Sequence, residues 1–261
     1  MTNLAHPVTH VVGAILSDAR QHARLTLGEA ARRLDMPAER LDHIESGRHH
    51  ATSADLYGLC RLYGMPDEAP ALDLLAAGSS AGGARSGVWE VHRHDCAHGF
   101  AGRLAAVARQ SVRVRWLSTH LIPPPLHTPA YAAAVLQPAP SRPWPQLRDQ
   151  DVVVLDESVV RRGSATATLM REQIRHLLNV QHTGGQVQVV PDLFPPGSYA
   201  ELTLAGDVTV VVTGGFTDVV YQATTALATH IDRALTEGDL DRSRRLLTEA
   251  YAHHRSHQEA R

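Results

Sequence analysis

The sequence contains no lysine, because all 25 of its basic residues are arginine. It has 3 Phe and 2 Cys, and the two cysteines, Cys60 and Cys96, are too few for a disulfide framework or a zinc site of several cysteines. It lacks the run of roughly 18–20 apolar residues that a membrane span needs, and its first ten residues do not resemble a signal peptide. We therefore expect a cytoplasmic protein with no membrane partner.

The length and charge of the chain limit its organisation and its partners. The 261 residues, 43% of them hydrophobic and 20% charged, are enough for one large domain or two smaller ones. The formal net charge of −2 excludes a strongly basic binder of polyanions, but it allows a local DNA-binding face.

The first 75 residues carry the pattern of four short helices. Apolar residues from Val12 to Ala19 recur at the spacing of one helical face. Thr26-Leu27-Gly28-Glu29 fits a capping box at the start of a second helix, and Asp35-Met36-Pro37 is a turn in which Pro suits the first position of a third helix. The third helix ends near Gly47, and a fourth begins after Thr52. Two short helices joined by a short turn are typical of a helix-turn-helix, whose second helix lies in the major groove of DNA.

These residues resemble the Cro/repressor-like (XRE) family over about residues 8–68. The resemblance is carried by Leu25-Thr26, Glu29-Ala30-Ala31-Arg32-Arg33-Leu34, Leu41-Asp42-His43-Ile44-Glu45-Ser46-Gly47-Arg48, and Leu56 with Leu62-Tyr63-Gly64. It implies double-stranded DNA as the partner and a homodimer as the binding form. It further implies that one set of side chains faces base edges and that two flanking sets hold phosphate. The base-facing residues are Glu39, Arg40 and His43, and the phosphate-binding residues are Thr26, Leu27 and Gly28 before them and Arg48 and His49 after them.

The segment also departs from that family. Asp42 stands where the family usually has Ser, and Asp35 stands where it usually has Gly. Up to Glu68 there are seven arginines against nine acidic residues, and acidic residues near the phosphate backbone weaken the electrostatic attraction to DNA. Binding that is weak, dimer-dependent or lost remains open, as does a plain surface role for Arg40 and Arg48.

Beyond a small, polar linker at residues 78–87, the pattern alternates between strands and helices. We expect an α+β protein: an all-α helix-turn-helix domain at residues 1–75, a linker at 76–94, and a mixed α/β regulatory domain at 95–261. The expected strands are residues 112–116, 152–155, 187–190, 202–204 and 208–212, and the expected helices are 169–178, 224–235 and 240–253.

The segment Leu121–Ala132 resembles a signature of the domain that follows the helix-turn-helix in WhiJ-like and Scr1-like antitoxin-type regulators of actinomycetes. Three later blocks, at residues 154–161, 170–178 and 187–191, follow in the same order. The resemblance implies regulation through a small acidic partner protein. Pro123-Pro124-Pro125 makes the signature loop stiff, and aromatic surface with polar tips suits recognition. The predicted ligand or partner residues are Trp116, His120, His127 and Tyr131, although Trp116 and Tyr131 also suit a core.

Catalytic and metal-binding patterns are scarce. The chain has no GxSxG or HExxH, and its glycine-rich stretch lacks the Lys of a phosphate-binding loop, so no catalytic residue or cofactor is indicated. Asp156-Glu157 is interpreted as a helix cap. His92, His94, Cys96 and His98 would share one face of an extended strand and offer ligands to zinc, or they lie in a loop that binds nothing.

Two functions follow from these observations. The first is a DNA-binding transcription regulator whose C-terminal domain senses a partner protein or a ligand. The second is a repurposed family member whose C-terminal domain binds or transforms a small molecule, with the N-terminal module as a scaffold, so enzymatic activity stays open. Neighbouring genes would discriminate between them: a small acidic partner supports the first, and a biosynthetic cluster supports the second.

Overall fold

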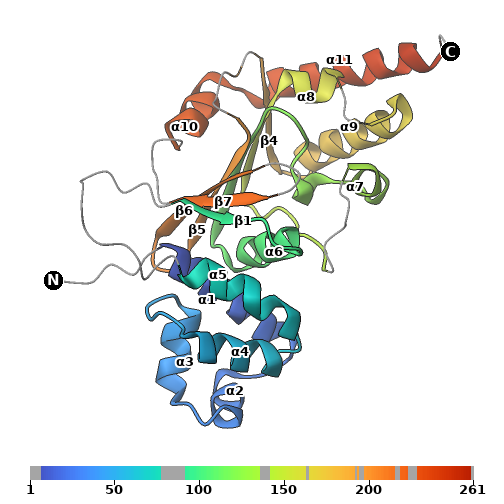
Figure 1. The fold of residues 1–261 in the computed structure, drawn as a ribbon. Coiled ribbons are helices and arrows are strands. Elements are labelled where there is room, and N and C mark those ends of the chain that lie inside the picture. The colour runs from blue at the N-terminus through green and yellow to red at the C-terminus, as the bar shows by residue number, and fades with distance from the viewer. Residues whose placement is uncertain are drawn as a thin grey trace. The chain divides into compact units, whose positions relative to one another are not determined.

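A computed structural model of the protein describes residues 7–77, 92–135, 142–162, 165–191, 193, 197–214, 218–222 and 228–259 (Figure 1). By its internal contacts the chain divides into two compact units. Met1–Val112 with Leu202–Thr224 forms the first unit, and Arg113–Glu201 with Thr225–Arg261 forms the second. Helices and both parallel and antiparallel strand pairs are present, which confirms the α+β class.

The first unit begins with the predicted helices. The predicted apolar stripe of the first helix, Val12, Ile15, Leu16 and Ala19, is buried, and so are most of the other residues from Val8 to Ala19. Pro37 is the N-cap of the third helix rather than its first residue, which corrects the predicted position. A fifth helix was not predicted, because its Ala- and Leu-rich sequence is apolar on nearly every side and shows no stripe. The elements are α1 (Pro7–His22), α2 (Leu27–Arg33), α3 (Ala38–Glu45), α4 (Ser53–Leu62), the 3₁₀ turn η1 (Pro66–Glu68) and α5 (Ala69–Ala77).

Later elements complete the first unit. Here β1 (His92–Asp95) pairs antiparallel with β7 (Val219–Gln222), which pairs antiparallel with β6 (Val208–Gly214). Helix α1 packs against α6 (Phe100–Gln110) and β6, and α5 contacts β1. This grouping differs from the predicted boundaries at residues 75 and 95, which assign α6 to the C-terminal domain. Most of the predicted linker, residues 78–91, lies outside the described residues.

A buried arginine joins η1, β1 and α6 within the first unit. Arg103 on α6 is 3% exposed, and its Nε and Nη2 donate to the two carboxylate oxygens of Asp95 at 2.7 and 2.6 Å. Its Nη1 contacts Glu68 and donates to the carbonyl of His98 at 3.0 Å. Arg109, near the C-terminal end of α6, pairs with Asp18 of α1 at 2.8 Å. The sequence pattern did not single out any of these charged residues.

The second unit contains three parallel strands: β2 (Arg113–Ser118), β3 (Val152–Asp156) and β4 (Gln186–Val190). In β3 the apolar residues Val153, Val154 and Leu155 form a continuous buried run, as expected of a parallel strand that is covered on both faces. Helix α11 packs along α8, α9 and β4 (Figure 1). Strand β5 (Tyr199–Leu204) starts in this unit and ends in the first. The helical elements are η2 (Pro124–Leu126), α7 (Pro129–Val135), α8 (Glu157–Arg162), α9 (Ala167–His182), α10 (Ala228–Glu237) and α11 (Leu240–Glu259).

Candidate nucleic-acid interface

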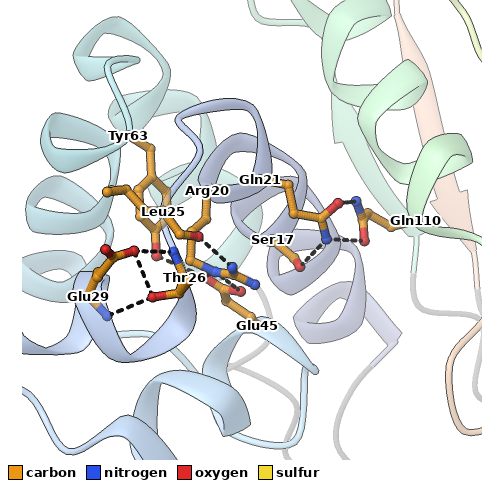
Figure 2. A network of polar contacts seen from close by, with 9 residues as sticks. All are labelled: Ser17, Arg20, Gln21, Leu25, Thr26, Glu29, Glu45, Tyr63 and Gln110. Atoms are coloured by element: carbon orange, nitrogen blue, oxygen red, sulfur yellow. Dashed lines mark hydrogen bonds and ion pairs between the residues drawn. The ribbon is translucent and has the colours of Figure 1, made fainter.

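The start of α2 is held by the predicted capping box. The Thr26 hydroxyl accepts from the Glu29 backbone N–H at 3.2 Å, and the Glu29 carboxylate accepts from the Thr26 backbone N–H at 2.8 Å (Figure 2). These bonds satisfy two orphan donors of the helix. The Thr26 hydroxyl also donates to the Glu29 carboxylate at 2.7 Å, and this bond, together with the bond from the Thr26 backbone N–H, lowers the pKa of Glu29. The start of α2 is therefore capped by side chains of the protein itself.

The turn between α2 and α3 spans Leu34 to Pro37. Asp35 has φ of +50°, the left-handed conformation that Gly adopts most easily and that Asp tolerates better than most residues. This observation explains why Asp can stand where the XRE family usually has Gly. The departure at position 35 therefore leaves the helix-turn-helix geometry intact.

A buried polar network fixes α3 against α1 and α4. Glu45, at the end of α3, is 8% exposed, and both of its carboxylate oxygens accept from Nε of Arg20, at 3.0 and 2.8 Å. The Tyr63 hydroxyl donates to the same carboxylate at 2.7 Å, and Nη1 of Arg20 donates to the Leu25 carbonyl at 2.9 Å (Figure 2). Burial and the neighbouring Glu45 carboxylate raise the pKa of Tyr63. Glu45 is one of the residues that carry the family resemblance, but the sequence alone gives it no role.

The backbones of α1 and α3 approach closely beside this network. A Cβ atom on Gly13 would lie 2.6 Å from the carbonyl oxygens of Ile44 and Glu45. Gly47 has φ of +72°, and a Cβ there would lie 2.4 Å from Cα of His10. Glycine is needed at both places, so the end of α3 has one fixed position on α1.

The side of α3 that faces away from this core is acidic. Leu41, Ile44 and Glu45 are buried. Glu39 is exposed, and Asp42 and His43 are partly exposed at the following positions of the same face. The outer face of the candidate recognition helix thus carries two carboxylates and one imidazole.

Both arginines predicted to contact DNA are paired within the first unit. Nη2 of Arg40 donates to the two carboxylate oxygens of Asp55 at 2.9 and 2.7 Å, and the Asp55 side chain is 8% exposed. Nη2 of Arg48 contacts Asp42, and its Nε donates to the Ser46 hydroxyl at 2.8 Å. Arg40 therefore links α3 to the N-terminus of α4, and the charge of Arg48 is balanced by a carboxylate on α3.

The other predicted DNA-contact residues lie around the same helices. Thr26 and His49 are exposed, and Leu27 and Gly28 are partly exposed. The His49 backbone N–H donates to the His43 carbonyl at 2.9 Å, which holds the chain close to α3 after that helix ends. The assignment of these residues to DNA contact stays a prediction.

The four predicted ligand or partner residues do not share one set of contacts in the second unit. Tyr131 is fully buried, and its ring meets that of His127 edge to face with centroids 4.8 Å apart. Trp116 is 8% exposed and stacks edge to face on Trp144 at 6.0 Å. His120 is exposed, and its Nδ1 lies 2.7 Å from the Thr119 hydroxyl. His127 and Tyr131 thus contact each other, Trp116 contacts Trp144, and His120 lies among polar side chains.

His127 makes the stability of the second unit depend on pH. Burial lowers its pKa from 6.5 to about 4, and among the described residues its Nδ1 has no hydrogen-bond partner. Between these two pH values the unfolded chain binds a proton that the folded protein does not, so acid favours unfolding. We expect the free energy of unfolding to fall as the pH drops from about 6.5 to about 4.

Urea unfolding at several pH values, followed by circular dichroism, measures this effect. His127→Gln is expected to remove part of the pH dependence, whereas His120→Gln, at an exposed histidine, leaves it unchanged. Equal pH dependence in the wild type and His127→Gln would contradict the assignment.

The structure describes only some of the side chains that the sequence offers for metal binding or catalysis. Asp156 caps α8, since its Oδ1 accepts from the Ser158 backbone N–H at 2.9 Å, which confirms the predicted cap. The segment with the histidines forms β1, but Cys96 and His98 lie beyond its end, and the side chains of His92 and His94 lie outside the described residues. Within the described part of the chain no group of three or more His, Cys, Asp or Glu side chains could hold a metal ion.

Comparison with known families agrees with the geometry of α2 and α3. Residues 12–72 match a helix-turn-helix domain. Residues 146–261 match a domain of unknown function (DUF5753). The first match supports a DNA-binding regulator with DNA as a partner, and the second assigns no activity. No curated protein and no solved structure matches the chain. No helix in the described ranges is both long and apolar enough to span a membrane.

Proposed function

We propose that the protein is a sequence-specific, DNA-binding transcription regulator. The observation that carries the proposal is the α2–turn–α3 unit, whose second helix is held by the Arg20–Glu45–Tyr63 network while its other face stays open. Glu39 and His43 on that face would reach base edges in the major groove, where a carboxylate can accept from the amino group of cytosine. His49, Arg48 and the N-terminus of α2, with Thr26, Leu27 and Gly28, would contact phosphates.

The type of regulator, its oligomeric state and its partners are proposed from the family resemblance of the sequence. We propose an XRE-type regulator related to the WhiJ-like and Scr1-like antitoxin-type proteins, acting on DNA in the cytoplasm. It would bind as a homodimer, because two half-sites multiply the modest affinity of one acidic module. The C-terminal region would sense a small acidic partner protein or a small-molecule ligand.

The proposal is tested by selecting DNA with the purified full chain from a pool of random duplexes and from sheared genomic DNA. We expect enriched sequences that share a motif, and binding that weakens as salt rises. Recovery of no shared motif, or retention that does not respond to salt, would overturn the proposed function.

Asp42 is expected to limit the affinity for DNA. Asp42→Ser removes a carboxylate from the face of α3 and releases Arg48 from its intramolecular pair. We expect binding to all duplexes to become about 3- to 10-fold tighter, with a salt dependence about one unit steeper in log–log slope. Fluorescence anisotropy over a salt series measures both quantities.

The matched control for Asp42→Ser is Asp67→Asn, which neutralises an exposed acid outside α3. It should change the affinity much less. An equal gain from the two variants would show that only net charge matters, and it would refute the role given to Asp42.

One observation favours the second candidate function. Both predicted DNA-contact arginines are neutralised within the protein, by Asp55 and Asp42, which is the arrangement expected of a module that has stopped binding DNA. In that case the N-terminal module is a scaffold, and the C-terminal region binds or transforms a small molecule. Loss of DNA binding in the selection experiment, together with binding of a small molecule, would favour this function.

A further inference from the structure

Four polar side chains converge just beyond the end of β2 in the second unit. The Ser198 hydroxyl accepts from the Thr119 backbone N–H at 3.0 Å. The same hydroxyl lies 3.4 Å from the Ser118 hydroxyl, 3.3 Å from the Thr119 hydroxyl and 3.4 Å from Nδ1 of His120. Ser118 is buried, Thr119 and Ser198 are partly exposed, and His120 is exposed. The cluster therefore has a buried base and an open side.

An arginine from a neighbouring element reaches this cluster. Nη2 of Arg162, at the end of α8, donates to the Ser158 hydroxyl at 2.9 Å and lies 3.5 Å from the Thr119 carbonyl. Because α8 follows β3 directly and β3 runs parallel to β2, Arg162 and the cluster meet at the carboxyl ends of two adjacent parallel strands. In open α/β sheets this edge is where ligands bind.

Within the described residues, no carboxylate balances the charge of the arginine at this edge. Among the described residues Arg162 contacts no carboxylate, whereas its neighbour Arg161 pairs with Glu157 and with Glu249. Asp156, at the end of β3, accepts from the backbone N–H groups of Ser158 and Leu193 with its two oxygens, at 2.9 and 3.0 Å. The cluster thus combines one exposed guanidinium, one exposed imidazole and several hydroxyl groups.

We propose that Thr119, His120, Arg162 and Ser198 bind the phosphate group of a small molecule. A phosphate presents oxygens in three directions, and these donors come from three segments: the end of β2, the end of α8 and the residue before β5. Arginine and hydroxyl groups are donors suited to phosphate oxygens. A planar carboxylate would use only two of these directions. The proposal deepens the proposed function by naming the class of ligand, but binding at this site does not require DNA.

The test is isothermal titration calorimetry of the full chain without DNA, at constant ionic strength set with chloride. The probes are inorganic phosphate and glycerol 3-phosphate, which separate a site for free phosphate from a site for a phosphate ester. We expect saturable binding of at least one of them. Arg162→Gln should weaken it about 10- to 100-fold, as the loss of one charge-assisted hydrogen bond predicts, and Ser198→Ala should weaken it by a smaller factor.

The matched control is Arg161→Gln, which removes the same charge from the adjacent position of α8 and should leave the affinity within about twofold of the wild type. Circular dichroism checks that each variant is folded. Absence of saturable binding of both probes, or an equal effect of Arg161→Gln and Arg162→Gln, would overturn the site. Neither outcome would affect the DNA selection, so the two proposals fail separately.

Discussion

Replacement of Glu45 by Ala is expected to lower the free energy of unfolding by about 3–5 kcal/mol and to abolish sequence-selective DNA binding. Glu45 is the shared acceptor of Arg20 and Tyr63, and its side chain is almost fully buried. Removing Glu45 leaves a partly buried guanidinium and a buried hydroxyl without their shared acceptor. The loss of stability is large because these groups stay away from water without that hydrogen-bond partner. Because the network joins α1, α3 and α4, α3 would also lose its fixed orientation.

Urea unfolding and DNA-binding anisotropy measure the two effects of Glu45→Ala. Glu39→Gln is the control for the stability measurement alone, since Glu39 lies on the exposed side of the same helix and its loss should change stability by no more than about 0.5 kcal/mol. Tyr63→Phe, which removes one donor only, should cost about 1 kcal/mol. An unchanged unfolding midpoint for Glu45→Ala would show that the network does not stabilise the helix-turn-helix.

Replacement of Arg103 by Ala is expected to have an effect of similar size, about 3–5 kcal/mol. Arg103 is the cation between Asp95, which is 2% exposed, and Glu68. Without it the Asp95 carboxylate remains buried and unpaired. Because α6 would also lose its ion pairs with η1 and β1, we expect the first unit to unfold at a lower urea concentration.

A double-mutant cycle separates this pair from a general loss of packing. Arg103→Ala with Asp95→Ala should cost clearly less than the sum of the two single variants, because no unpaired charge is left. Arg233→Ala, at an exposed arginine of α10, should leave the midpoint unchanged. Simple additivity of Arg103→Ala and Asp95→Ala would contradict a direct ion pair.

Local signals in the sequence were sufficient for most elements. The capping box of Thr26 and Glu29 placed the start of α2, an alternating pattern placed β2, and short β-branched runs placed β3 to β6. Helix α6 was missed because Gly102 and Arg103 interrupt its apolar pattern, although Arg103 is buried. Strand β7 was missed because four residues are too few to show an alternation.

By itself the sequence determined the α+β class, the helix-turn-helix and the positions of its turn, because caps, turns and apolar spacing are properties of neighbouring residues. Only the tertiary structure decided the partners of the charged side chains. Arg40 was predicted to face DNA, yet its guanidinium meets Asp55, fifteen residues later in the chain. Glu45 and Arg103 carry charges that a pattern assigns to the surface, yet both are buried beside partners brought together by the fold. An ion pair depends on the distance between two side chains in space, and the order of residues along the chain does not give that distance.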